Sequence, residues 1–143
     1  VAAYTAILAQ GLEQLGHTLT SDTAFDTVTV KAGTQAQALL KRALDAGMNL
    51  RLSWGEYVGI ALDETTTRED IEALWKVFAA PGQALPSLAG FEKGVEPRIP
   101  AELRRTSAFL THPVFNTHHS ETGMLRYIRS LSDKDLALDR SMI

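Results

Sequence analysis

The sequence predicts a small soluble α+β domain, a two-layer sandwich of short strands with helices on one face, followed by a helical arm. Apolar residues recur at three- and four-residue steps in three stretches before residue 80, the spacing of one helix face. Between these stretches, apolar and β-branched residues alternate with others over 26–31 and 49–62, the period of a half-buried strand. The order helix, strand, helix, strand, strand, helix favours one sheet covered by helices on one side.

The first helix is predicted to end at Gly16, because glycine supplies the left-handed conformation that commonly terminates helices. Val28 and Val30 then alternate with threonines and predict the first strand. The apolar stripe of the first helix consists of Tyr4, Ile7, Leu8, Leu12 and Leu15.

The second helix is predicted to begin with a capping box, in which the Thr34 hydroxyl and the Gln37 amide bond free N–H groups reciprocally. Gly47 is expected to close this helix. Trp54-Gly55 can turn the chain, so the alternating residues on either side of it predict a hairpin over 49–62.

The third helix has the clearest helical pattern in the chain. Thr66 and Glu69 repeat the capping-box spacing before it, and Pro81-Gly82 is expected to end it. Its apolar residues fall at i, i+3, i+4 and i+7 and are Ile71, Leu74, Trp75 and Phe78.

The composition changes after residue 80, where glycine and proline interrupt a stretch without any apolar period. We therefore expect a small α+β domain over 1–80, a linker over 81–99 and a helical connecting arm over 100–143. Within the arm, Ser120 is predicted to cap a helix. The arm carries too little apolar surface to fold alone, so we expect it to lie on another part of the protein.

Composition excludes several classes of function. The 14 basic residues are scattered and the formal net charge is −3, so nothing directs the chain to nucleic acid or to an anionic membrane. Cysteine is absent, which excludes disulfides and cysteine nucleophiles. No apolar run approaches the roughly 20 residues that cross a bilayer. The chain starts within a helical pattern without targeting features and stops on Met142-Ile143, so we expect both ends to be cut from a larger protein.

Side chains that could perform chemistry have ordinary structural explanations. Ser120 reads as a helix cap, and the acidic pairs at 63–64 and 69–70 lie where a helix N-terminus favours negative charge. No glycine-rich phosphate loop is present, and no lysine has the context of a Schiff-base lysine. We therefore predict no catalytic residue, no cofactor-binding residue and no metal ligand.

The only histidine cluster supports an alternative hypothesis, a small metal-dependent hydrolase. His112, His118 and His119 could bind a metal if Glu121 or Asp135 completed the site. Their spacing matches no recognisable ligand pattern, and we favour loop and capping roles for them.

Two stretches resemble the glycine decarboxylase component of the glycine cleavage system, the P-protein family. They are VGIALDETTTREDIEALW at 58–75 and RRTSAFLTHPVFNTHHSETGMLRYI at 104–128, and KDLALDRSMI follows at 134–143. The weaker stretch FDTVTV at 25–30 falls in the right order, so the resemblance spans nearly the whole chain. The run His119-Ser-Glu-Thr is its most distinctive part.

The resemblance implies a fold and a place in it. The family has two homologous halves, each like a fold-type I pyridoxal-phosphate enzyme of the aminotransferase type, with a large α/β domain followed by a small C-terminal α+β domain. Residues 1–80 resemble the small domain of the first half, and 81–143 resemble the connection toward the second half. The lysine that binds the cofactor belongs to that second half, so this chain is expected to bind no pyridoxal phosphate and to be inactive alone.

The resemblance also implies the chemistry and partners of the parent enzyme. The parent uses pyridoxal phosphate to decarboxylate glycine and transfers the aminomethyl group to the lipoyl arm of the H-protein. We expect the remaining domains of the parent chain, the H-protein and other copies of the parent as partners, with no nucleic acid and no membrane. The expected location is the cytoplasm of a bacterium or the mitochondrial matrix of a eukaryote.

Matched polar residues at the predicted loop-to-helix junction are the candidates for an active-site cleft or an interface between the two halves, because site residues often lie on such junctions. A competing hypothesis is a free-standing, non-catalytic binding or assembly module with the same small-domain architecture. The candidate residues are Asn116, His119, Ser120, Glu121 and Arg126.

Overall fold

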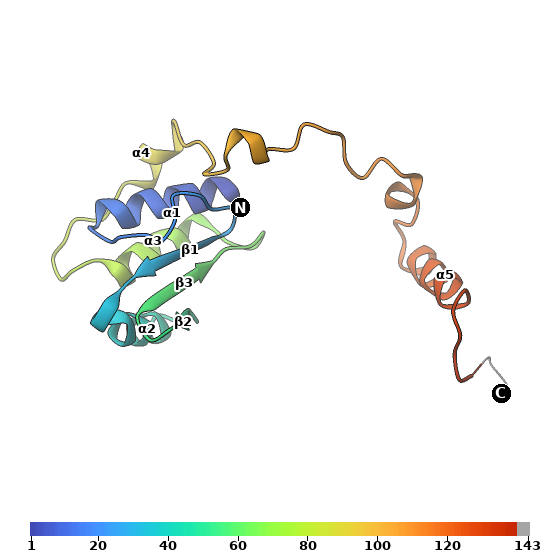
Figure 1. Cartoon of the computed structure of the whole chain (residues 1–143), viewed down its shortest axis with the longest axis horizontal. Helices are drawn as coiled ribbons and strands as arrows, with labels where there is room; N and C mark the ends of the chain where they lie inside the picture. The colour runs from blue at the N-terminus through green and yellow to red at the C-terminus, as the bar shows by residue number, and fades with distance from the viewer. Residues whose placement is uncertain (140–143) are drawn as a thin grey trace. The chain divides into compact units, whose positions relative to one another are not determined.

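The sheet has three antiparallel strands in the order β1-β3-β2, in a computed structural model that describes residues 1–139. The strands are β1 (Thr27–Lys31), β2 (Arg51–Ser53) and β3 (Tyr57–Ala61). Helix α1 precedes the strands, α2 lies between β1 and β2 in the sequence, and α3 follows β3, which is the predicted order (Figure 1). The α+β class is therefore confirmed.

The two faces of the sheet differ in burial. Val30 on β1 lies opposite Val58 on β3, and both are fully buried against the helices. On the other face, the side chains of Thr29 and Tyr57 point away from this core because side chains alternate along a strand. The outer edge of β1 is covered, since the Thr20 N–H donates to the Thr29 carbonyl at 2.9 Å.

Helix α1 (Ala2–Gln14) is more deeply buried than its predicted stripe requires. Thr5, Ala6, Ala9 and Gly11 are buried as well as the predicted leucines, because other elements cover the helix on several sides. Gly16 ends the helix as predicted, with a φ of 94°.

Helix α2 (Ala36–Asp45) does not begin with the predicted capping box. The chain enters it through a 3₁₀ turn over Gly33–Gln35, and the Glu56 carbonyl accepts the N–H groups of Ala32 and Gly33 at 2.9 Å each. These tertiary hydrogen bonds place Thr34 inside the turn, where it cannot take the extended conformation of an N-cap. The capping box at 34–37 was therefore a wrong prediction.

Helix α3 (Arg68–Phe78) has a capping box one residue later than predicted. The Thr67 hydroxyl accepts the Asp70 N–H at 3.3 Å, and the Asp70 carboxylate accepts the Thr67 N–H at 2.8 Å. Thr66 is not the cap because its hydroxyl accepts the Asp63 N–H at 3.0 Å in the preceding turn.

The predicted hairpin is present, with Trp54 and Gly55 in its turn at φ values of 47° and 77°. The Glu56 N–H donates to the Ser53 carbonyl at 3.3 Å and closes the turn. A left-handed φ is ordinary for glycine and unusual for a bulky residue such as tryptophan.

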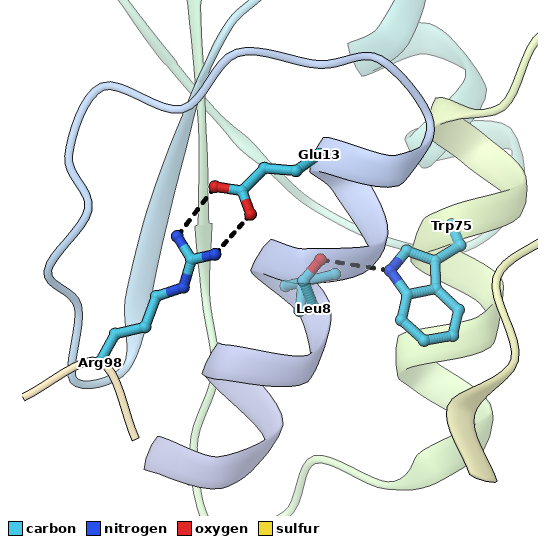
Figure 2. A network of polar contacts seen from close by, with 4 residues as sticks. All are labelled: Leu8, Glu13, Trp75 and Arg98. Atoms are coloured by element: carbon cyan, nitrogen blue, oxygen red, sulfur yellow. Dashed lines mark hydrogen bonds and ion pairs between the residues drawn. The ribbon is translucent and has the colours of Figure 1, made fainter. Parts of the chain in front are cut away.

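Helices α1 and α3 contact each other, and α2 contacts α3 and β3, so the helices form one layer on the sheet. Trp75 on α3 is fully buried and its indole N–H donates to the Leu8 carbonyl at 3.2 Å (Figure 2). A Cβ atom at Gly11 would lie 2.2 Å from the Trp75 ring. Close packing of these two helices therefore depends on the absence of a side chain at residue 11.

The stretch expected as a linker packs on this domain. It contains the short helix α4 (Leu88–Glu92), whose Leu88 is only 2% exposed. Phe91 contacts the Trp75 ring edge at 6.0 Å between centroids, and Arg98 forms a two-pronged ion pair with Glu13 (Figure 2). The first compact unit accordingly runs from Val1 to Arg104, well beyond residue 80, because apolar residues after Pro81 complete its core.

The second unit begins at Arg105. It contains a 3₁₀ turn over Pro113–Asn116 and helix α5 (Glu121–Ser132). Ser120 caps α5 as predicted. Within 105–139 no residue is buried, which agrees with the expectation that this segment has too little apolar surface for a core of its own. The last four residues of the matched stretch at 134–143 lie outside the described residues.

Candidate functional site

The predicted site residues lie at the junction between the Pro113–Asn116 turn and α5. Ser120 is engaged in capping, since its hydroxyl accepts the Gly123 N–H at 3.0 Å and its carbonyl accepts the Met124 N–H at 2.9 Å. The oxygen that a nucleophile would need is therefore occupied in starting the helix. Asn116 is also engaged locally, because its side-chain amide donates to the Leu110 carbonyl at 3.4 Å.

The other three candidates are exposed, and the helix separates two of them. Glu121 and Arg126 are five residues apart on α5, which places them about 140° apart around the helix axis. Glu121 shares its face with Leu125 and Ile128, whereas Arg126 lies on the opposite side. His119 precedes the cap and is exposed. The five candidates therefore form no single cluster, and their place at a cleft or interface remains a prediction.

The junction contains a cluster that the sequence analysis missed. The rings of His118 and Tyr127 stack with centroids 4.2 Å apart and an interplanar angle of 10°. Beside them is a hollow of about 320 Å³ that Val114, Phe115 and Met124 also line. The sequence contains a signal that could have predicted this cluster, because apolar residues before a helix cap often contact the first turns of that helix.

The histidines do not form a metal site. The His112 ring nitrogen accepts the Val114 N–H at 3.1 Å and caps the 3₁₀ turn, while His118 stacks on Tyr127. Within residues 1–139, no three histidine, aspartate or glutamate side chains lie close enough to hold a metal ion. The structure therefore gives the metal-dependent hydrolase hypothesis no support.

The lysines do not fit a pyridoxal-phosphate site. A Schiff-base lysine needs a desolvated pocket that lowers its pKa and a cradle for the cofactor. All five lysines are exposed, and the hollows found in the part of the chain that the structure describes contain none of them: Lys31, Lys41, Lys76, Lys93 and Lys134. We derive no catalytic step through this cofactor for these residues.

Helix α5 exposes an apolar stripe. Leu125 is 58% exposed and Ile128 is 51% exposed, and both lie one helical turn apart on the same face. Met124 and Leu131 extend this stripe. Uncovered apolar surface of this kind marks a site of interaction. None of the described helices is long and apolar enough to cross a membrane.

Comparison with known sequences places this α+β unit and its arm in one family. The family model described as "Glycine cleavage system P-protein" matches residues 1–78, more than half of the chain. The chain belongs to the glycine cleavage system P-protein family. The resemblance noted in the sequence is therefore confirmed.

Curated relatives carry a more specific name. The chain is 60% identical over 143 residues to the glycine dehydrogenase (decarboxylating) of Variovorax paradoxus. The matched region covers 100% of this chain and 15% of the relative. It is 52% identical over 139 residues to that of Cupriavidus metallidurans, covering 97% of the chain and 14% of the relative. It is 50% identical over 143 residues to that of Nitrobacter winogradskyi. The chain thus spans about 15% of the length of these relatives.

Proposed function

We propose that this chain acts as a small structural domain and connecting arm of a glycine dehydrogenase (decarboxylating). In this proposal the whole protein decarboxylates glycine in the cytoplasm and passes the aminomethyl group to the lipoyl arm of the H-protein. The identity of 60% over the whole chain to a protein of that name is the observation that carries the proposal. The unit 1–104 would be the small domain of a fold-type I half, and the arm would connect it to the next half.

The cofactor would bind outside these residues. Pyridoxal phosphate would supply the electron sink for decarboxylation in the whole protein. All five lysines are exposed, and none lines a hollow of the described residues, which supports a structural role for this chain. The isolated 143 residues would accordingly be inactive.

The arm would contact the remainder of the polypeptide through the stripe on α5. Its apolar residues are uncovered, and this chain covers only 15% of the length of its Variovorax relative. Glu121 lies at the N-terminal end of the stripe, so its carboxylate would face this interface. Arg126, on the opposite side of α5, would face away from it. Of these two residues, Glu121 is therefore the one we propose to lie at the interface.

Glycine–bicarbonate exchange by the full-length protein tests this role. We expect Glu121→Ala to lower the exchange rate by about tenfold or more, the usual cost of disturbing a positioned group, and Arg126→Ala to have a smaller effect. Lys41→Ala, at an exposed position of α2, is the matched surface control and should leave the rate unchanged. Unaltered kinetics in both arm variants would rule out a role of these residues at the active-site cleft or between the halves.

A second measurement tests the inactivity of the isolated chain. Purified residues 1–143 mixed with pyridoxal phosphate should show no aldimine absorbance band. Borohydride reduction of the mixture should give no adduct at a single site. Release of carbon dioxide from glycine together with such an adduct would contradict the proposal. The full-length protein, treated in the same way, is the positive control.

A further inference from the structure

The face of the β2–β3 hairpin that points away from the helices contains a hollow of about 680 Å³. The residues that line it are Arg51, Tyr57 and Trp54 together with Thr20, Thr29, Leu52 and Ser53. Tryptophan, tyrosine and arginine are the residue types that most often dominate the energy of protein–protein interfaces. All three are gathered here on one short hairpin, far along the sequence from the proposed arm interface.

Arg51 is available to a partner. In the unit that ends at Arg104, the side chains of Arg42, Arg68, Arg98 and Arg104 each have a hydrogen bond or an ion pair, whereas the Arg51 side chain has none among the described residues. Its side chain lies over Gly59 on β3, because a Cβ atom at Gly59 would be only 3.5 Å from the Arg51 Nε. The Arg51 side chain therefore packs beside β3 and stays exposed rather than pairing within the domain.

Trp54 is presented outward by its backbone. Its side chain is 91% exposed, and its φ of 47° is one that bulky residues rarely adopt. Tyr57 supports it from the side, since the two rings meet edge to face with centroids 5.9 Å apart. An unfavourable conformation that places a large aromatic side chain in water is typical of a functional surface.

The charge of this face selects the partner. Arg51 is the one charged residue that lines the hollow, and Lys31 lies opposite Tyr57 in the strand register, on the same face. Glu56 is the nearest carboxylate along the hairpin, and it lies in the turn outside the hollow. A face with two cations and two aromatic rings is complementary to a segment that carries carboxylates beside apolar side chains.

We propose that this hairpin face (Thr29, Arg51, Ser53, Trp54 and Tyr57) is a docking surface for an acidic segment of another protein. Arg51 binds a carboxylate through its planar guanidinium, and the rings of Trp54 and Tyr57 contact the neighbouring apolar side chains. This surface shares no residue with the α5 stripe, and it is proposed independently of the glycine chemistry, so either proposal can fail without the other.

The two tryptophans allow a direct test by nuclear magnetic resonance on the 143-residue chain. We expect a synthetic peptide of glutamate and leucine residues to shift the Trp54 indole N–H signal saturably, with a Kd of about 1 mM or lower. The Trp75 indole is buried and its N–H donates a hydrogen bond to the Leu8 carbonyl, so its signal is the internal control and should not shift. Added salt should weaken the binding because it is partly ionic.

Variants identify the residues responsible. Arg51→Glu and Trp54→Ala should each weaken peptide binding by about tenfold or more, as expected for central interface residues. The Gly55 amide signal reports binding when Trp54 is absent. Lys76→Glu, an exposed charge reversal on α3, should bind the peptide as the unaltered chain does. An unchanged Trp75 signal in every variant shows that the fold is intact.

Three results would overturn the proposal. The first is a Trp54 signal that does not respond to the acidic peptide, and the second is an equal response to a lysine and leucine peptide of the same length. The third is a Trp54 shift that depends on the concentration of the chain alone, because this would assign the face to a second copy of the chain.

Discussion

At the scale of single residues, the close approach of α1 to α3 depends on Gly11. A Cβ atom there would lie 2.2 Å from the Trp75 ring, far inside van der Waals contact. The ring cannot easily move away, because Trp75 is fully buried and its indole N–H is bonded to Leu8. Glycine is normally unfavourable within a helix, so its presence in α1 reflects packing and not local preference.

We predict that Gly11→Ala destabilises the chain by up to about 2 kcal/mol. Alanine alone would stabilise the helix by about 1 kcal/mol, and overpacking a core costs about 1–3 kcal/mol or more, so the sign of the change is informative. Urea denaturation measures it. Gly94→Ala is the matched control, because nothing lies within 4 Å of its Cβ position, and it should leave stability nearly unchanged. A stabilised Gly11→Ala variant would show that the Trp75 contact is not close.

At the scale of elements, the start of α3 depends on the Thr67–Asp70 pair. Hydrogen bonds from the Thr67 backbone N–H and hydroxyl hold the pKa of the Asp70 carboxyl below its usual value. The Thr65 hydroxyl and backbone N–H similarly lower the pKa of Asp63 in the preceding turn. A carboxyl group whose pKa is lower in the folded state stabilises the fold above its unfolded pKa of about 3.9. This stabilisation is lost as the pH falls through the folded-state pKa.

We predict that Asp70→Ala lowers the free energy of unfolding at neutral pH by about 1 kcal/mol, the usual value of a helix cap. The difference from the unaltered chain should shrink as the pH falls below about 4, because the carboxyl group is protonated first in the unfolded chain and, at lower pH, in the folded one. Denaturation at a series of pH values measures it. Glu69→Ala is the control, since Glu69 lies in the same first turn outside the capping box. Equal effects of the two variants would mean that only the helix dipole matters.

At the scale of the whole molecule, the first unit needs the residues beyond Pro81. Leu88 is buried, Phe91 contacts Trp75, and the Arg98 carbonyl accepts the Ala24 N–H at 3.0 Å. Residues 81–104 thus cover α1 and α3. The arm that begins at Arg105 contributes no buried residue among those described.

We predict that residues 1–104 unfold at the same urea concentration as residues 1–143, whereas residues 1–80 are less stable by about 3 kcal/mol or more. Burying a leucine or phenylalanine side chain contributes about 1.5–3 kcal/mol, and 1–80 loses both Leu88 and Phe91. Residues 1–143 should also associate in light scattering and bind a hydrophobic dye more than 1–104 does, since they retain the α5 stripe. Equal stability of 1–80 and 1–104 would support residue 80 as the end of the domain.

Local sequence patterns were sufficient to predict a structural feature wherever residues of the same element determine it. The period of the third helix, the Gly16 terminus and the Ser120 cap could all be predicted, because they depend on residues within one or two turns. The start of α2 could not, since the Glu56 carbonyl from the far hairpin sets the conformation of Ala32 and Gly33. The junction before α5 shows the same division: the Ser120 cap was predicted, and the His118–Tyr127 stack was missed because it joins a loop to a helix face.

The sequence by itself determined the α+β class, the order of its helices and strands, and membership of the P-protein family, since these depend on local periodicity and on the identity of matched residues. Only the tertiary structure decided that α4 and Arg98 belong to the first unit, that Gly11 leaves room for Trp75, and that Trp54 and Arg51 share an open face. The reason is physical: contacts between residues distant in sequence depend on how the elements pack, and no local period records them.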